Sequence, residues 1–176
     1  MSVNIYNADG STPLGTSPLS STGTFSVDVG TYTGVIFAKV VNANAGVDYM
    51  DEATGQGKDL TATLMAVAVV PGGNITVNMN AITSIASIKA GVSSDGVVPA
   101  TISAQVVVDT NTAVATAFGL VNILTVEPVA TIAVDGTANT NYDPATLSDG
   151  AKYGAVLAAL SGADYNNGGV MKKNRG

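Results

Sequence analysis

The sequence predicts an α+β protein in which an N-terminal antiparallel β-sandwich is followed by a small helical extension. Short segments in the first eighty residues alternate apolar and polar side chains, and turn signals separate them. The apolar residues then change to a helical period after Met79. Apolar residues make up 46% of the 176 residues, so the chain can bury a core without disulfides.

The strand patterns of the first part alternate cleanly in most segments, and one segment is a continuous apolar run with Lys39 as its interruption. Residues 34–41 form that continuous run, which is typical of a central strand buried on both faces. Residues 11–22 contain Pro13 and Pro18 and predict an edge strand or a loop. Residues 51–57 predict a loop. The remaining predicted strands cover residues 3–6, 24–29, 47–50, 59–70 and 74–79.

Three helices are expected in the second part of the chain. The first covers residues 82–88 with Asn80 as its cap, and the second covers residues 100–118 and ends at Gly119. Ser148 caps the third, which runs to residue 159 or 160 and ends at Gly162. The predicted division is a sandwich domain over residues 1–80, a helical extension over residues 81–165, and a flexible tail over residues 166–176.

The apolar faces of these helices follow from residue spacing. The faces are predicted to contain, in the first helix, Ile82, Ile85, Ala86 and Ile88; in the second, Ile102, Val106, Ala113, Ala117 and Phe118; and in the third, Tyr153, Val156, Leu157 and Leu160.

Composition excludes several kinds of chemistry. The chain has no His, Cys or Trp, so it lacks the commonest acid–base group, thiolate nucleophiles and Cys-based metal sites. A net charge of -6 argues against nucleic acid as a partner. No apolar run reaches the length of a membrane span. We therefore expect a protein that is not an enzyme and binds no cofactor, with calcium as the one metal to consider.

Calcium takes hard oxygen ligands, and Asp48, Asp51 and Glu52 lie together before a glycine-rich segment. The spacing is not that of an EF-hand loop. The alternative interpretation is an acidic loop that stays in solvent, with Asp51 or Glu52 accepting hydrogen bonds from local backbone amides. A second chemical hypothesis is a Lys–Asn isopeptide bond, for which Lys39 with Asn78 or Asn80 is the candidate.

Several motifs occur in the order found in one known group. They are Gly23-Thr24-Phe25-Ser26-Val27, the run from Tyr49 to Gln56, the run from Val77 to Ala86, and the run from Tyr153 to Ser161. The chain resembles the carboxypeptidase-regulatory-like, transthyretin-like β-sandwich modules of large secreted bacterial surface proteins, which carry a helical extension. The resemblance implies an Ig-like or transthyretin-like sandwich with a structural or adhesive role and no active-site residues.

The function expected is that of a structural or adhesive module on the bacterial surface or outside the cell. A Cys-free chain with neutral polar surface residues is typical of that location. Its partners are other copies or neighbouring domains. Residues 2–8 are a candidate for strand donation to a second subunit, and the alternative is pairing within their own sheet. The second hypothesis is a polysaccharide- or surface-ligand-binding module, whose candidate platform residues are Tyr6, Tyr32, Tyr49, Tyr142 and Tyr165.

Overall fold

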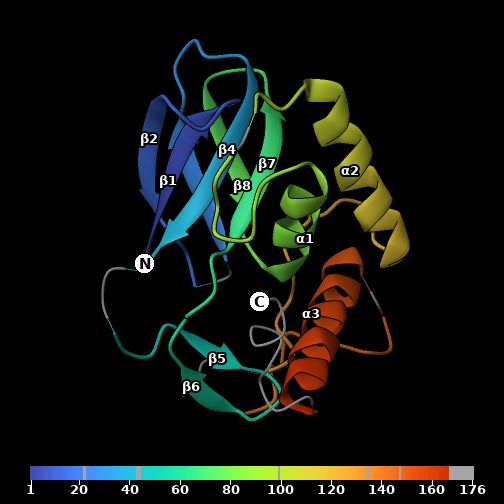
Figure 1. Ribbon diagram of the computed structural model, residues 1–176. Helices are drawn as coiled ribbons and strands as arrows, with labels where there is room; N and C mark the ends of the chain where they lie inside the picture. Colours follow the sequence, from blue (N-terminus) through green and yellow to red (C-terminus); the bar gives the residue numbers. More distant parts are fainter. Residues whose placement is uncertain (22, 43–44, 99, 134, 147, 167–176) are drawn as a thin grey trace. The chain divides into compact units, whose positions relative to one another are not determined.

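The computed structural model describes residues 1–166 except residues 22, 43–44, 99, 134 and 147. Over these residues the chain is a mixed α+β protein with antiparallel sheets and three helices (Figure 1). It divides into two compact units, each built from two stretches of sequence. The first unit contains residues Met1–Asn44 and Thr63–Glu127. The second contains Ala45–Ala62 and the described residues from Pro128 onward.

The main sheet of the first unit is antiparallel throughout, with the strand order β2-β1-β4-β7. Its strands are β1 (Ser2–Asn7), β2 (Pro13–Pro18), β4 (Gly34–Val41) and β7 (Met65–Val70). Strand β2 begins and ends with proline and lies at the sheet edge, where a missing backbone N–H is tolerated. Strand β1 lies between β2 and β4, so its backbone is paired within its own sheet on both sides.

One face of the main sheet carries a buried apolar core. The register places Phe37 of β4 beside both Tyr6 of β1 and Val67 of β7. The rings of Tyr6 and Phe37 stack with centroids 6.1 Å apart. Residues outside the sheet, among them Ile102 and Val107, complete this core. Strand β4 is buried along most of both faces, as its continuous apolar run predicts.

A second, two-stranded sheet of the first unit pairs β3 (Thr24–Asp28) with β8 (Asn74–Asn78). The predicted alternation is confirmed, since Phe25 and Val77 face each other in the register and are buried. On the opposite face Ser26 and Thr76 are exposed and their hydroxyl oxygens lie 2.5 Å apart.

Helix α1 (Ala81–Lys89) begins where the sequence predicts. The side chain of Asn80 accepts hydrogen bonds from the backbone N–H groups of Ile82 and Thr83 at 3.0 and 3.2 Å. Its predicted apolar face is wrong at Ile85 and Ile88, which are 40% and 47% exposed. Buried serines occupy part of the inner face instead, because their hydroxyls find hydrogen-bond partners there.

Helix α2 (Ala104–Ala117) starts at Ser103, later than predicted. Its predicted face is wrong at Val106, Ala113 and Ala117, which are exposed. Ile102, just before the helix, is buried as predicted. The buried residues of this helix are Val107, Thr110, Asn111, Val114 and Ala115. Both α1 and α2 pack on β7, and the boundary expected at residues 80 and 81 therefore falls inside the first unit.

The second unit is built around a short hairpin and a long helix. The hairpin pairs β5 (Tyr49–Asp51) with β6 (Gln56–Lys58). The strand predicted over residues 47–50 overlaps β5, whereas β6 begins inside the loop predicted over residues 51–57. Helix α3 (Asp149–Asn166) begins beside Ser148, whose hydroxyl accepts from the N–H of Ala151 at 3.2 Å. Gly162 does not end the helix as predicted, since its backbone stays in the helical range.

Other boundaries differ from the predictions as well. The strand expected over residues 59–70 begins only at Met65, and the division between the two units falls within the expected segment. The predicted flexible tail over residues 166–176 lies outside the described residues apart from Asn166, which ends α3.

Among the helices of the described residues, none combines the length and the apolar character needed to cross a membrane.

Candidate functional site

Asp51, at the end of β5, is a carboxylate of the second unit with several hydrogen-bond partners. Its side chain forms an ion pair with Lys58 of β6 and accepts a hydrogen bond from the hydroxyl of Ser161 on α3. It also accepts from the Thr54 hydroxyl at 2.8 Å and the Ala53 N–H at 3.2 Å. We call Asp51, Thr54, Lys58 and Ser161 the Asp51 network. The hydrogen bond from Ser161 to Asp51 links the hairpin to α3.

The Asp51 carboxylate is buried, with only 4% of the residue exposed. Burial alone would raise its pKa because it disfavours the charged form. Hydrogen bonds from Lys58, Ser161, Thr54 and the Ala53 backbone outweigh burial and hold the pKa of Asp51 well below its usual range. Asp51 is therefore a carboxylate at neutral pH and accepts hydrogen bonds only.

Lys58 is the cation of this network. Its hydrogen bond to Asp51 raises its pKa, so it stays protonated near neutrality and cannot act as a base. Its side chain is 43% exposed. Ser161 lies against a carboxylate that is too weakly basic to take its proton. The arrangement is therefore suited to holding segments together and lacks an activated nucleophile.

Glu52 binds a different segment of the same unit, the one that contains Thr131. One of its carboxylate oxygens accepts from the Thr131 N–H at 2.8 Å and from the Thr131 hydroxyl at 2.9 Å. Thr131 belongs to a turn-rich segment in which Ile132 and Ala138 form an isolated antiparallel bridge. Adjacent carboxylates in the hairpin thus bind to two distant parts of the chain.

The structure does not gather the three predicted calcium ligands around one point. Asp48 accepts from the N–H of Leu60 at 2.9 Å, while Asp51 and Glu52 have the partners described above. Within the described part of the chain, no three carboxylates lie close enough together to hold a metal. The alternative interpretation is confirmed in part, since Asp51 accepts from the local backbone amide of Ala53, but it is wrong about solvent, because Asp51 is buried.

The residues of the isopeptide hypothesis, Lys39, Asn78 and Asn80, each form other hydrogen bonds. The Lys39 amine lies 3.4 Å from the carbonyl oxygen of Gly96. The Asn78 side-chain amide donates to the carbonyls of Ile123 and Val126, at 3.1 and 2.6 Å. Asn80 caps α1. Each candidate residue therefore has hydrogen-bond partners other than those that the isopeptide hypothesis pairs.

The five candidate tyrosines do not form one platform. Tyr6 stacks in the core, and the Tyr32 hydroxyl donates to the carbonyl of Val35 at 2.6 Å. Tyr142 is half-buried. Tyr49 and Tyr165 are 44% and 57% exposed, and both belong to the second unit. These two are the tyrosines left as candidates for contact with a ligand.

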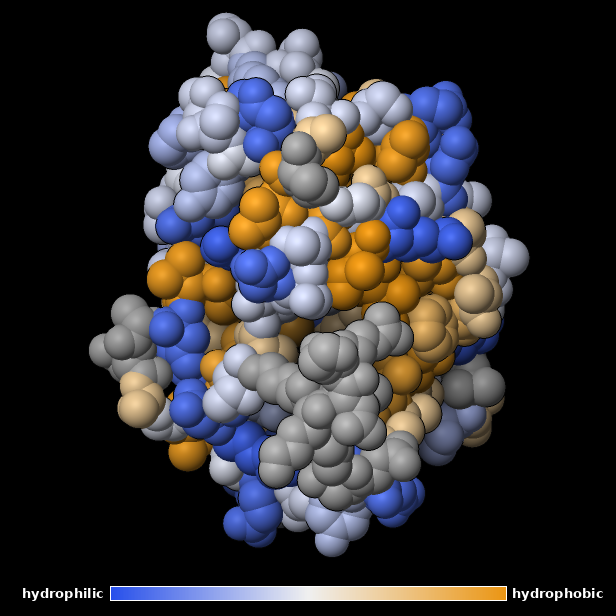
Figure 2. Space-filling model, viewed as in Figure 1, coloured by the Kyte–Doolittle hydropathy of each residue, from blue (hydrophilic) through white to orange (hydrophobic). Residues whose placement is uncertain are grey.

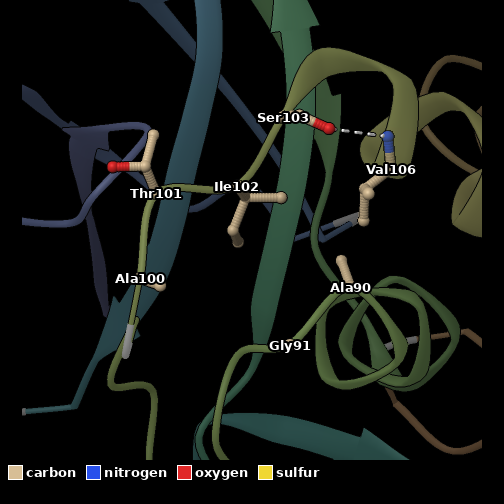
Figure 3. Close-up of a pocket in the computed structure, with 7 residues that line it drawn as sticks. All are labelled: Ala90, Gly91, Ala100, Thr101, Ile102, Ser103 and Val106. Carbon is tan, nitrogen blue, oxygen red and sulfur yellow. Dashed lines mark hydrogen bonds between the residues drawn. The ribbon is translucent and has the colours of Figure 1, made fainter.

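A shallow apolar hollow of about 220 Å³ lies in the first unit, beside the start of α2 (Figure 3). Ala90, Gly91 and Ile102 line it, together with Val106, whose N–H donates to the Ser103 hydroxyl at 3.3 Å. Figure 2 shows hydrophobic surface over the region of α1 and α2. No residue lining the hollow is charged, so it has no group for acid–base chemistry.

Replacing Asp51 with asparagine tests the network. The change removes the ion pair but preserves the shape, and we expect the free energy of unfolding of the second unit to fall by about 2 kcal/mol at pH 7. The pKa of Asp51 is lower in the folded protein than its ordinary value of 3.8. Its stabilising contribution is therefore complete above about pH 5 and is lost progressively as the pH falls below that value.

Hydrogen exchange of α3 amides at a series of pH values measures this effect. Asp149→Asn is the matched control, because its ion pair with Lys152 is exposed and spans 3.7 Å; we expect a loss of about 0.5 kcal/mol or less. An Asp51→Asn variant as stable as the native chain at pH 7 would show that the network does not hold the hairpin to α3.

Sequence reasoning found Asp51 and Glu52 but missed their partners. Lys58 lies on the neighbouring strand, where Asp51 pairs with Gln56 and Tyr49 pairs with Lys58. A predicted hairpin would have brought the two charges together. Ser161 and Thr131 are 110 and 79 residues from their carboxylates, and no local pattern indicates such pairings.

Comparison of the chain with protein-family models, with curated proteins and with solved structures found no match.

Proposed function

We propose that the chain is a non-catalytic structural or adhesive module of a bacterial extracellular protein. In this proposal its antiparallel sheets form an Ig-like or transthyretin-like sandwich of the carboxypeptidase-regulatory-like group. The observation that carries it is the Asp51 network, in which a buried charge joins segments of the chain instead of lining a cavity. Neutral polar residues and the absence of Cys support a location on the cell surface or outside the cell.

The proposed partners are other copies of the chain or neighbouring domains of the same surface protein. For residues 2–8, the pairing of β1 with β2 and β4 supports the alternative to strand donation, which is pairing within their own sheet. We therefore propose that self-association uses a surface other than β1.

Sedimentation over a range of concentrations, with electron microscopy of the same samples, tests self-association. We expect oligomers or filaments whose fraction rises with concentration. Particles that stay monomeric at every concentration would contradict self-association. Antibody labelling of intact source cells tests the location, and labelling only after permeabilisation would contradict an extracellular role.

The second candidate is a polysaccharide- or surface-ligand-binding module. Exposure of Tyr49 and Tyr165 favours it, because exposed rings supply stacking surface for sugars. Binding to a panel of polysaccharides that is lost on Tyr49→Ala or Tyr165→Ala, and kept on Tyr32→Phe, would select this candidate. Turnover of any polysaccharide in the panel would overturn the non-catalytic proposal.

A further inference from the structure

Strand β7 lies at the edge of the main sheet and pairs with β4 on one side only. The Val40 N–H donates to the Leu64 carbonyl at 2.9 Å, which fixes the phase of the antiparallel ladder. Bonded and non-bonded pairs alternate in such a ladder. Because Val40 and Leu64 form a bonded pair, the non-bonded positions on β7 are Met65, Val67 and Val69. The backbone N–H and C=O groups of these positions point away from β4, toward the place that a further strand would take.

Side chains of the two helices occupy part of that position. The Met65 N–H donates to the Ser84 hydroxyl of α1 at 2.9 Å. The Asn111 amide of α2 donates to the Val67 carbonyl at 3.0 Å. Ser84 and Asn111 are 9% and 8% exposed, so both bonds are shielded from water. They replace hydrogen bonds that a neighbouring strand would make.

The replacement is incomplete at Asn111. Its side-chain carbonyl oxygen is buried and has no hydrogen-bond partner among the described residues. A side-chain amide carries the same donor and acceptor as a peptide group, and here only the donor is used. An unpaired buried acceptor costs stability, so packing alone gives no reason to keep an asparagine at this point.

The composition of β7 is typical of a segment that pairs with an identical strand of another chain. Met65–Val70 reads MAVAVV and contains neither a charge nor a proline. Six-residue apolar segments with β-branched side chains are aggregation-prone when an edge is open. The opposite edge of the sheet, β2, has a proline at each end.

We propose that Ser84 and Asn111 form an edge lock, which keeps β7 from pairing antiparallel with β7 of a second copy. Two equal strands paired in this way make a two-fold symmetric contact. The inference goes beyond the structural role proposed above, because it identifies the edge and the groups that control it, and it holds whether or not the chain acts at a cell surface.

A double variant, Ser84→Ala with Asn111→Ala, opens the lock. The matched control is Ser87→Ala with Thr110→Ala, which removes buried hydroxyls from the same helices. Ser87 and Thr110 bond only to carbonyls of their own helices, Thr83 for the former and Val106 and Val107 for the latter. Sedimentation measures dimerisation, and hydrogen exchange measures protection of the Met65 amide.

We expect the lock variant to dimerise with an association constant raised about tenfold or more, and to exchange the Met65 amide faster when monomeric. The control should do neither. Adding Val69→Lys should abolish the new dimer, because a lysine on an edge strand opposes pairing. If the double variant does not fold, Ser84→Ala alone still removes the acceptor of the Met65 N–H.

Three results would overturn the edge lock. One is a folded lock variant with an unprotected Met65 amide that associates no more than the native chain. Another is equal dimerisation of the control variant, which would trace association to general destabilisation. The third is a dimer that Val69→Lys leaves intact. Native oligomers with a protected Met65 amide would support the proposed self-association through another surface, and would leave the lock closed as inferred.

Discussion

Replacing Gly154 with alanine is expected to destabilise the second unit by roughly 3 kcal/mol. Gly154 lies within α3, and a Cβ added there would sit 1.7 Å from the carbonyl oxygen of Val129. The obstacle is backbone and cannot rotate away. The Val129 N–H donates to the Gly150 carbonyl at 2.9 Å, so this segment is bound closely to the helix. Alanine at position 154 would force the two apart.

The same substitution at Gly162 provides a control with the opposite sign. Gly162 belongs to α3 as well, and a Cβ added there meets nothing within 4 Å. Alanine is favoured over glycine in a helix interior by about 1 kcal/mol, so Gly162→Ala should stabilise α3. Hydrogen exchange of α3 amides measures both variants. Equal effects at the two positions would contradict the close approach of Val129.

Replacing Phe37 with alanine is expected to lower the free energy of unfolding of the first unit by about 4 kcal/mol. Phe37 is 2% exposed, stacks on Tyr6 and lies against Val67. Removing the ring leaves a cavity in the core beneath the helices. The cost combines lost apolar burial with the contacts that the cavity walls lose.

Chemical denaturation, together with hydrogen exchange of the β1, β4 and β7 amides, measures the loss in the free energy of unfolding. Val69→Ala is the control on the same face of the sheet, since Val69 is 42% exposed and should cost about 1 kcal/mol or less. A Phe37→Ala variant that loses no more than Val69→Ala would place the core elsewhere.

The strands of the first unit could be predicted because their local signal is strong. Alternation identified β3 and β8, and the apolar run of 34–41 identified a central strand. The inner face of α2 could not be predicted in the same way. Thr110 and Asn111 occupy it, and spacing arguments count only apolar residues. These polar residues are buried because partners on β7 and in the helix itself accept their hydrogen bonds.

The candidate site was predictable only in part. Asp51 and Glu52 drew attention as adjacent charges, but the metal interpretation assumed that neighbours in sequence share one ligand. The hairpin instead directs Asp51 to Ser161 and Glu52 to Thr131. Those pairings depend on the fold of the whole second unit, which no short segment encodes.

The interrupted course of the second unit has a consequence for synthesis on the ribosome. Residues 45–62 emerge from the ribosome early, while Pro128 and the residues after it emerge much later. In the interval the first unit can complete its sheet, since all of its strands and both of its helices precede residue 128. During that time Asp51 already has its partners Lys58 and Thr54 in the nascent hairpin. Ser161, a further partner of Asp51, and Thr131, the partner of Glu52, have not yet been synthesised. Folding of the two units is therefore expected to be ordered in time, with the second unit closing only after α3 has been synthesised.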